Sequence, residues 1–217
     1  MASASAGGGG GPQQLFFDVW SRFYDLPAVQ RAIYRPVQDA VITELIAGPH
    51  QRVLDVGCGT GLLTSRLAAG VYGTTVVGCD FSFGMLSQAS AGDSPVAGWV
   101  QGDAQRLPVA SSSFDAVVCT ESFHWYPDQS AALAEFRRVL RPGGRALIAF
   151  VNPPFEGMAQ MLSRASEAAG QPATWQTAPQ MRSLVSSAGL TVVAQQRIGR
   201  LPGAMTMPPV LTVARRP

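Results

Sequence analysis

Three glycines alternate along a short run, at Gly57, Gly59 and Gly61, directly after an apolar stretch and before residues with helical character. Glycine lets the backbone turn tightly, and it lets amide groups approach a ligand that a Cβ atom would push away. The first turn of the following helix adds free N–H groups, which favour a bound carboxylate. The nicotinamide and flavin fingerprint GxGxxG would need a glycine at Leu62. The spacing therefore departs from that fingerprint, although by itself it fits several nucleotide cofactors.

Three aspartates stand within or just after successive β-rich runs, at Asp55, Asp80 and Asp103. Asp80 follows the glycine run by roughly twenty residues, a distance at which an acid can accept hydrogen bonds from ribose hydroxyls. Asp103 could accept a hydrogen bond from an adenine amino group. A single aspartate after a strand is often a turn former or a helix cap, and Asp80 alone would also suit NAD. Together with the glycines, the three acids favour an adenosine-containing cofactor.

His124 is the one candidate general base, in the run Thr120–Tyr126 that directly follows a fourth apolar stretch. Open α/β sheets bind ligands at the carboxyl ends of their strands, which is where this run falls. A general base contributes only when the acceptor of a transferred group must lose a proton. The alternative is that His124 lines the pocket or has a structural role, and the sequence leaves both open.

The hydropathy pattern supplies a sheet that can bring these residues together. Short β-rich runs alternate with amphipathic stretches, which is typical of a parallel sheet with helices on both faces. The predicted strands are Arg52–Val56, Thr74–Cys79, Ala97–Gln101, Ala116–Cys119 and Arg145–Val151, and the predicted helices are Leu62–Ala69, Phe83–Ser90 and Ser130–Leu140.

The two ends of the chain follow other patterns. The spacing predicts a helix over Gln180–Ala188, followed by strands at Leu190–Ile198 and Pro209–Ala214. No crossover helix fits between these last two strands, so they must pair antiparallel.

We expect one domain from residue 13 to 217, preceded by a disordered tail over residues 1–12. Residues 13–47 are predicted to be helical, residues 51–151 form the cofactor-binding core, and residues 179–217 form the C-terminal helix and hairpin. Residues 152–178 lie between the core and that helix.

The composition excludes several classes of protein. The net charge is +2, and the 16 basic residues, all arginine, are scattered, so nucleic acid is not an expected partner. No apolar stretch reaches the ~18 residues of a membrane span. The cysteines Cys58, Cys79 and Cys119 lack metal-ligand spacing, so we expect reduced thiols, no metal and a cytoplasmic location.

Four motifs in order carry a family resemblance: VLDVGCGTG, VVGCDFS, GDAQRLPVASSSFDAVVC and LRPGG. They resemble the class I S-adenosylmethionine-dependent methyltransferases, and more narrowly the branch that includes the ubiquinone- and menaquinone-pathway enzymes. The resemblance implies a single doubly wound, Rossmann-like α/β domain with helices on both faces. It also implies a seven-stranded sheet in the order 3-2-1-4-5-7-6, with strand 7 antiparallel.

The resemblance further implies that the cofactor is S-adenosyl-L-methionine, and it assigns roles to single residues. Asp55, Gly57, Cys58, Gly59 and Gly61 belong to the motif that wraps the methionine part; Asp80 would hold the ribose; Phe81 and Met85 would pack the adenine; Asp103 and Ala104 would contact its polar edge; Thr120 and Glu121 would lie near the sulfonium; and Tyr24, in the aromatic stretch Trp20–Tyr24, would belong to an N-terminal lid.

The acceptor is expected to be a small molecule methylated on O, C or N, held between the N-terminal helix and the segment 152–178. Met158, Met161, Leu162 and Trp175 in that segment could line an apolar site or belong to the core. No large insertion is present, so the site would be fairly open or completed by a second chain in a homodimer.

Other functions are less favoured. Asn152-Pro153-Pro154-Phe155 is similar to a motif of protein and nucleic-acid amino-methyltransferases, but it follows the fifth predicted strand and not the fourth. Two prolines there more simply end a strand. A cofactor-binding, activating subunit without catalysis is the main alternative, and a nicotinamide-dependent oxidoreductase is a weaker one because of Leu62.

Overall fold

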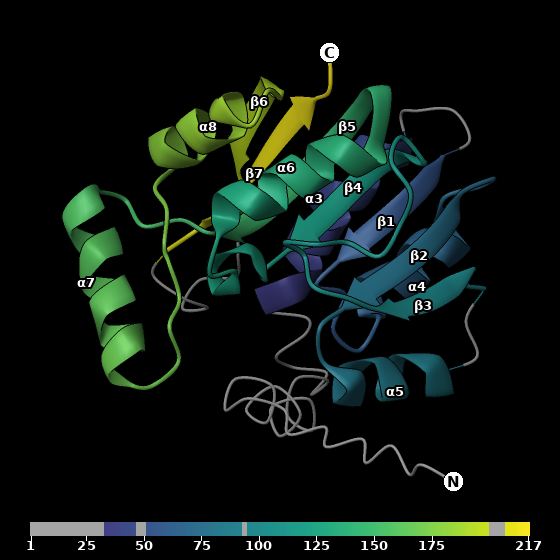
Figure 1. The fold of residues 1–217 in the computed structure, drawn as a ribbon, viewed down its shortest axis with the longest axis horizontal. Coiled ribbons are helices and arrows are strands. Elements are labelled where there is room, and N and C mark those ends of the chain that lie inside the picture. Colours follow the sequence, from purple (N-terminus) through teal and green to yellow (C-terminus); the bar gives the residue numbers. More distant parts are fainter. Residues whose placement is uncertain (1–32, 47–50, 93–94, 200–206) are drawn as a thin grey trace, which may run out of the picture.

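The computed structural model describes residues 33–46, 51–92, 95–199 and 207–217. Within them a seven-stranded sheet runs in the order β3-β2-β1-β4-β5-β7-β6 (Figure 1). The strands are β1 (Arg52–Val56), β2 (Thr75–Asp80), β3 (Gly98–Gln101), β4 (Phe114–Thr120), β5 (Leu140–Val151), β6 (Thr191–Arg197) and β7 (Pro209–Arg215). Strands β1 to β5 pair in parallel, and β7 is antiparallel to both β5 and β6. The predicted strand order and the antiparallel hairpin are confirmed.

The fifth strand begins at Leu140, whereas the sequence predicted a start at Arg145. Leu140 pairs with Phe114, and the next regular pair joins Arg145 to Ala116. The intervening residues of β5 bulge outward, and Gly143 takes a φ of 78° within this bulge. The prediction missed the pairing of Leu140 because the proline and glycines of this turn interrupt the β-rich pattern along the sequence.

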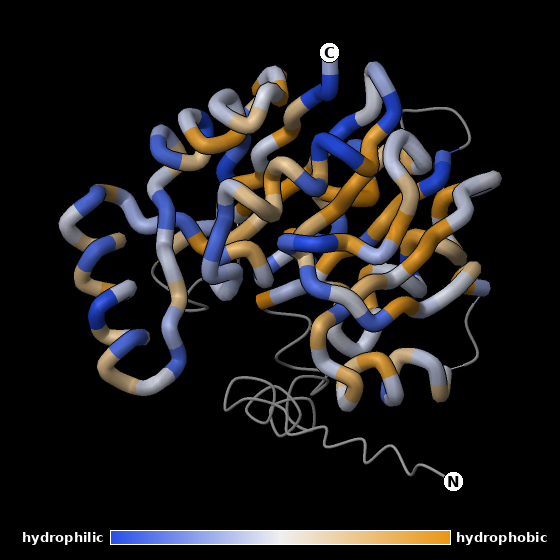
Figure 2. Tube along the Cα trace, in the orientation of Figure 1, coloured by the Kyte–Doolittle hydropathy of each residue, from blue (hydrophilic) through white to orange (hydrophobic). Residues whose placement is uncertain are grey.

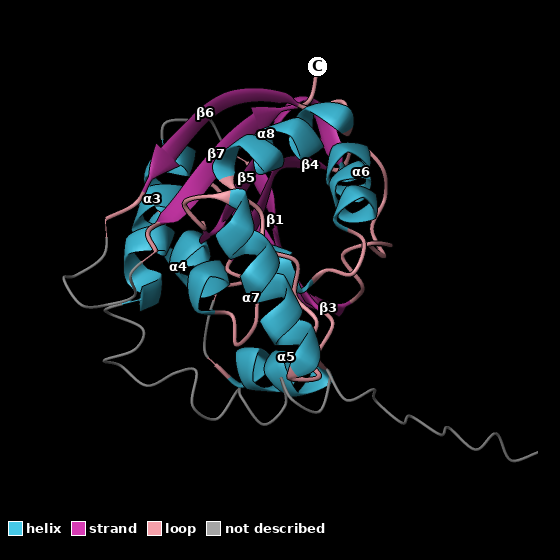
Figure 3. Cartoon of the chain, turned by 90° about the vertical axis from the view of Figure 1, so that its left-hand side faces the viewer, coloured by secondary structure: helices cyan, strands magenta, loops and turns pink. Residues whose placement is uncertain are grey.

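Helices cover both faces of the sheet, as predicted (Figure 3). α3 (Arg35–Ile46) and α4 (Leu62–Gly70) pack on one face, and α6 (Gln129–Val139) and α8 (Ala178–Ser187) on the other. α5 (Phe83–Ala91) packs against β2 and β3 at one edge of the sheet. Figure 2 shows the hydrophobic residues concentrated in the central strands between these layers.

The helices α5, α6 and α8 begin where a short polar side chain accepts a backbone N–H. Asp128 accepts from Ala131 at the start of α6, at 2.9 Å. Thr177 and Gln180 form a capping box at the start of α8. Such caps satisfy N–H groups that have no partner inside the helix, so they fix the point at which each helix begins.

The segment after β5 forms α7 (Glu156–Ala168), which stands away from the sheet (Figure 1). Ala159 is its one buried residue, and the side chain of Met161 is 59% exposed. The predicted amphipathic helix is therefore present, but a core role for Met161 is wrong because the sheet does not extend beneath α7.

α3 is the described part of the predicted N-terminal helical region. The predicted tail and the predicted lid residues Trp20 and Tyr24 lie outside the described residues. None of the described helices is both long and apolar enough to cross a membrane.

Candidate active site

The glycine loop follows β1 and turns across the end of β2. Gly57, Gly59 and Gly61 have φ values of 71°, 57° and 79°, in the left-handed region that residues with a Cβ rarely adopt. The N–H groups of Gly57 and Cys58 both donate to the carbonyl of Cys79, over 2.8 and 3.1 Å. These bonds fix the loop to β2.

Asp80 ends β2 and joins the glycine loop to α5. One carboxylate oxygen accepts the N–H of Gly59 at 2.8 Å, and the other accepts the N–H of Ser82 at 2.8 Å. The hydroxyl of Ser82 in turn accepts the N–H of Met85 at the start of α5, at 3.2 Å. The carboxylate is held in one orientation by these two N–H groups.

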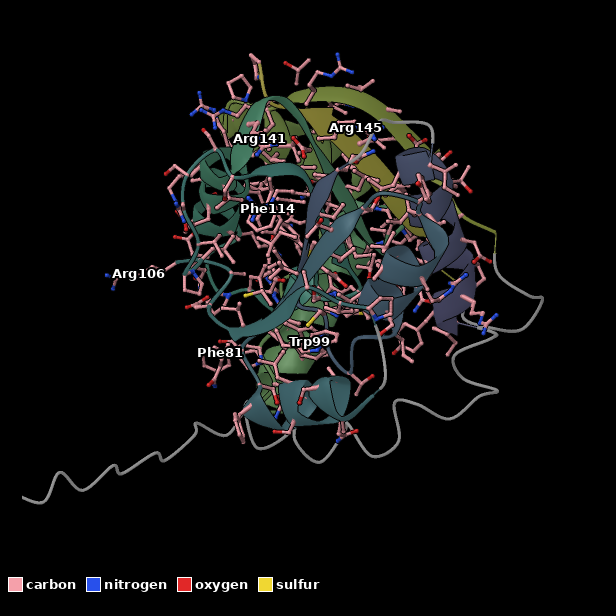
Figure 4. All side chains as sticks on the ribbon, turned by 90° about the vertical axis from the view of Figure 1, so that its right-hand side faces the viewer. Phe81, Trp99, Arg106, Phe114, Arg141 and Arg145 are labelled. Atoms are coloured by element: carbon pink, nitrogen blue, oxygen red, sulfur yellow. The ribbon has the colours of Figure 1, made fainter. Side chains whose placement is uncertain are left out.

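The ring of Trp99 supports the glycine loop from β3. A Cβ built on Gly61 would lie 2.3 Å from this ring, and one built on Gly78 would lie 2.5 Å from it. Figure 4 shows Trp99 and Phe81 at the end of the molecule next to α5. Sequence reasoning missed Trp99, because its contact with Gly61 depends on the pairing that sets Trp99 opposite Gly78.

Asp103 and Ala104 begin the loop between β3 and β4. The carboxylate of Asp103 accepts the backbone N–H of Gln105 at 2.9 Å and its side-chain amide at 3.1 and 3.3 Å. The side-chain carbonyl of Gln105 accepts the N–H of Asp128 at 2.9 Å. The loop is therefore fastened to the start of α6.

Arg138 of α6 holds the rest of that loop. Its guanidinium donates to the carbonyls of Leu107 and Val109, at 3.0 and 2.9 Å, and pairs with Glu135 at 2.6 Å. Glu135 also accepts the N–H of Leu107 at 2.8 Å. Hydrogen bonding from Arg138 lowers the pKa of Glu135, so this carboxylate stays ionised.

The end of β4 is strained. Glu121 has a φ of 56°, in the left-handed region, and its N–H donates to the carbonyl of Ala149 at 2.7 Å. A non-glycine residue held in this region costs about 1–3 kcal/mol and is typical of functional sites. Because β4 pairs in parallel with β1, Thr120 and Glu121 lie at the carboxyl end of the sheet, next to the end of β1.

A cluster of hydroxyl groups missed by sequence reasoning ties the end of β4 to the end of β1. The hydroxyls of Ser122 and Tyr126 lie 3.0 Å apart, and both donate toward the carbonyl of Val56, at 3.3 and 3.4 Å. A Cβ on Gly57 would lie 2.3 Å from the Ser122 hydroxyl. Their spacing of four residues in the sequence could have suggested that the two hydroxyls lie close together, but only the fold places them beside Gly57.

These elements surround one cavity of about 540 Å³, within the usual range for small-molecule sites. Most of the predicted site residues line it: Gly57, Gly59, Asp80, Phe81, Met85, Asp103, Ala104, Thr120, Glu121 and His124. Residues not singled out from the sequence complete the wall, among them Ile33, Tyr34, Ser122, Tyr126 and Val151. Trp175, which the sequence left open between site and core, also lines it, whereas Met158, Met161 and Leu162 do not.

Three other predicted residues lie behind the cavity wall. Asp55 is buried, its carboxylate accepts the Thr64 hydroxyl at 2.6 Å, and burial raises its pKa to about 7. The side chain of Cys58 is buried, and Gly61 packs on Trp99. They support the loop from beneath.

His124 is buried at the cavity wall. Its ring stacks on Trp175, with centroids 4.3 Å apart and planes inclined by 18°, and burial lowers its pKa to about 3. Its Nδ1 has no hydrogen-bond partner among the described residues. The imidazole is therefore neutral near pH 7 and a weak base in this setting, which favours the pocket-lining alternative.

The motif that begins at Asn152 has a structural use. Asn152 does not line the cavity, and its side-chain amide donates to the carbonyl of Gln176 at 3.1 Å. This bond holds the segment that carries Trp175. The position of Asn152 outside the cavity gives no support to a role in binding an amide or amine during nucleic-acid methylation.

The charged groups around the cavity suit a cationic cofactor that contains adenosine. Asp80, Asp103 and Glu121 line the cavity, and the described lining includes no lysine or arginine. Figure 4 shows Arg106, the nearest arginine along the chain to Asp103, projecting away from the body of the protein. Acidic groups in a partly enclosed site attract a positive charge such as a sulfonium, and the glycine loop leaves its backbone open to the rest of the ligand.

Comparison with known proteins agrees with this geometry. Residues 54–148 match the family described as "Methyltransferase domain". The chain is 40% identical over 142 residues to the demethylmenaquinone methyltransferase of Beutenbergia cavernae, covering 64% of this chain and 58% of that protein. It is 37% identical over 132 residues to the malonyl-[acyl-carrier protein] O-methyltransferase of Hahella chejuensis, covering 60% and 46%. The matches thus span less than two thirds of either relative.

A solved structure shares the fold over nearly the whole chain. It is described as a complex between the Haloferax volcanii Trm112 methyltransferase activator and a methyltransferase, and it aligns with a TM-score of 0.79 at 24% identity, covering 93% of this chain and 97% of that chain. The family match covers residues 54–148, which include the glycine loop, Asp80 and Asp103. The solved structure shows that the fold is shared.

Proposed function

We propose that this chain transfers a methyl group from S-adenosylmethionine to an oxygen, carbon or nitrogen atom of a small-molecule acceptor. One observation carries the proposal: a single cavity is lined on one side by the glycine loop, Asp80 and Asp103, and on another by the aromatic wall of His124 and Trp175. The first side suits the cofactor, and the second leaves an apolar face for an acceptor.

Each residue of the cofactor side has a role in binding. S-adenosylmethionine, when bound, supplies a methyl group activated by the positive sulfur. Asp80 would accept hydrogen bonds from the ribose hydroxyls, and Asp103 would accept one from the adenine amino group. The backbone at Gly57 and Gly59 would enclose the methionine part. Phe81, 56% exposed at the cavity rim, covers the adenine. Tyr24 remains a predicted lid residue.

Alignment of the acceptor provides most of the rate enhancement in this proposal. Methyl transfer needs the attacking atom, the methyl carbon and the sulfur in line, and such positioning supplies roughly 7–11 kcal/mol. The neutral His124 ring, stacked on Trp175, gives the cavity an aromatic surface that can hold an acceptor in this line. His124 contributes as part of that surface and not as a strong base.

The acceptor is proposed to be small because the cavity must hold the cofactor and the reacting group together. The two curated relatives are named for different acceptors, demethylmenaquinone and a malonyl group on an acyl-carrier protein. Their names support a small reacting group but do not select one. A homodimer and a cytoplasmic location also stay predictions.

Calorimetric titration and methyl transfer test the proposal together. We expect S-adenosylmethionine to bind and NAD not to bind. Asp80→Ala removes charge-assisted hydrogen bonds worth about 1.5–3 kcal/mol each, so cofactor affinity should fall at least about tenfold. Asp39→Ala, at an exposed position of α3, is the matched control and should bind like the parent.

Transfer of labelled methyl groups to small molecules extracted from the source cell separates an enzyme from an activating subunit. We expect label in a small-molecule product, and none with Asp80→Ala. Tight cofactor binding without any labelled product would contradict catalysis by this chain. Label in protein or nucleic acid alone would contradict the acceptor class.

A further inference from the structure

A second cavity, of about 290 Å³, lies beside the first. Its walls come from α7, from the chain around Trp175 and from the start of α8: Ala159, Gln160, Ser163, Arg164, Thr174, Trp175, Gln176 and Gln180. Trp175 is common to both cavities. The two spaces therefore adjoin at this side chain.

Trp175 is held in place at the boundary that the two cavities share. One face of its ring stacks on His124, at the main cavity. On the side of α7, its backbone N–H donates to the Ser163 hydroxyl at 3.1 Å, and its indole N–H donates to the Ser166 hydroxyl at 3.4 Å. The ring is thus fixed between the main site and the helix that stands away from the sheet.

The two cavities carry opposite charges. The main cavity has three acids and no lysine or arginine in its described lining, whereas Arg164 is the only charged residue among those described around the second. Arg164 makes no ion pair or side-chain hydrogen bond within the described part of the chain. Its guanidinium is available to an anion, and its planar fork suits a carboxylate or a phosphate.

Amide groups beside Arg164 add uncharged hydrogen-bonding capacity. Gln160 lies four residues before Arg164, on the same face of α7. Gln176 uses its side-chain N–H in a bond to Gln129 but keeps its side-chain carbonyl, and Gln180 keeps its side-chain N–H group. These amides make the lining of the second cavity more polar in proportion than that of the first.

We propose that the second cavity is a subsite for an anionic tail of the acceptor, a carboxylate or a phosphate bound by Arg164. The reacting end of the same molecule lies against Trp175 in the main cavity, next to the cofactor. Opposite charges in the two cavities then orient the acceptor, because its anionic end is repelled by Asp80, Asp103 and Glu121. This subsite rests on the proposed methyl transfer.

The test starts from the labelled product formed in the small-molecule extract. At neutral pH we expect it to be retained on an anion-exchange column. Treatment with alkaline phosphatase then distinguishes the sources of charge: loss of retention identifies a phosphate monoester. If retention is unchanged, the mass of the product separates a carboxylate from a phosphodiester. Either result supports the subsite, whereas a labelled product that passes through the column overturns it.

The second experiment measures methyl transfer by Arg164→Ala. The fraction of the extract that is retained on the anion-exchange column supplies the acceptor. We expect the KM for that fraction to rise about tenfold or more, with kcat within about twofold and cofactor affinity unchanged. Arg164→Lys should recover part of the loss. Arg182→Ala, an exposed arginine on α8 that lines neither cavity, is the matched control.

The outcomes separate this inference from the proposed function. Equal KM values for Arg164→Ala and Arg182→Ala, with methyl transfer intact, overturn the subsite alone. Cofactor binding without any labelled product overturns both.

Discussion

The carboxylate of Asp80 accepts backbone N–H groups from Gly59 and Ser82, and the same carboxylate forms part of the cavity wall. One side chain therefore shapes the glycine loop and presents acceptors to the ligand. Asp55, buried behind the loop, carries out a different task. Its carboxylate accepts the Thr64 hydroxyl, and burial raises its pKa to about 7. Burial behind the loop thus favours the neutral form of the Asp55 carboxyl.

The raised pKa of Asp55 makes stability depend on pH. The folded protein binds the Asp55 proton more tightly than the unfolded chain does. The stability that this proton adds is therefore fully present below the ordinary pKa of 3.8 and is lost as the pH rises to about 7. His124 acts in the opposite sense. Burial lowers its pKa from 6.5 to about 3, so its contribution is full above pH 6.5 and is lost as the pH falls toward 3.

Asp55→Asn should separate these opposing effects. Asparagine keeps an acceptor for Thr64 but carries no charge, so at pH 7.5 the variant should be more stable than the parent. The gain is bounded at about 4 kcal/mol by the size of the pKa change. Urea unfolding at pH 4, 6 and 7.5 should show the gain shrinking as the pH falls. A gain of equal size at all three values would contradict ionisation as its cause.

The glycine loop and α4 act as one element, because Gly61 ends the loop and α4 begins at Leu62. Gly61 has a φ of 79° and leaves no room for a Cβ against Trp99. Gly70, at the far end of the same helix, has nothing within 4 Å of the position that a Cβ would take. A side chain is therefore excluded at Gly61 but has room at Gly70.

Gly61→Ala should destabilise the fold by about 2 kcal/mol or more, since it adds both backbone strain and overlap with the Trp99 ring. It should also weaken S-adenosylmethionine binding. Gly70→Ala is the matched control, and we expect it to change the free energy of unfolding by less than about 1 kcal/mol. Thermal unfolding and calorimetric titration measure both effects. Equal stability of the two variants would contradict the role assigned to Trp99.

α6 positions the loop of Asp103 without touching the cavity. Arg138 on this helix holds the carbonyls of Leu107 and Val109. Its neighbour Arg137 makes one side-chain bond within the described residues, to the carbonyl of Gly189 at 3.3 Å. The two adjacent arginines thus differ in what they hold together.

Arg138→Ala should lower the free energy of unfolding by about 2 kcal/mol, because several hydrogen bonds to partly buried loop carbonyls are lost. The loop that carries Asp103 should loosen, and cofactor affinity should fall about three- to tenfold. Arg137→Ala should change both quantities much less. If the two variants have the same cofactor affinity, α6 does not position this loop.

At the scale of the whole molecule, the cavity gathers the ends of β1, β2 and β4 and the loop after β3. A ligand that contacts all of them binds the folded state and not the unfolded chain. Its binding energy is therefore added to the stability of the sheet.

S-adenosylmethionine at 100 times its Kd should add about 2.7 kcal/mol to the free energy of unfolding. For a domain of this size, that raises Tm by about 5–10 °C. NAD at the same concentration should leave Tm unchanged. Calorimetric scans at several cofactor concentrations check the expected logarithmic dependence, and an equal shift with NAD would contradict the cofactor assignment.

The sequence by itself determined the elements and the cofactor side of the site. Alternating apolar runs, the glycines at 57, 59 and 61 and the acids at 80 and 103 are local signals, since strand period and turn chemistry depend on near neighbours along the chain. The strand order followed from the family resemblance, and the structure confirmed it. The bulged start of β5 was missed because a turn interrupts its pairing.

Only the tertiary structure decided what surrounds those residues. Trp99 reaches Gly61 through the pairing of β2 with β3, and Tyr126 reaches the carbonyl of Val56 across 70 positions of the chain. The low pKa of His124 comes from burial against Trp175, which spacing cannot reveal. Burial, packing and the separation of charges between two cavities depend on which distant segments meet, and no local pattern encodes that.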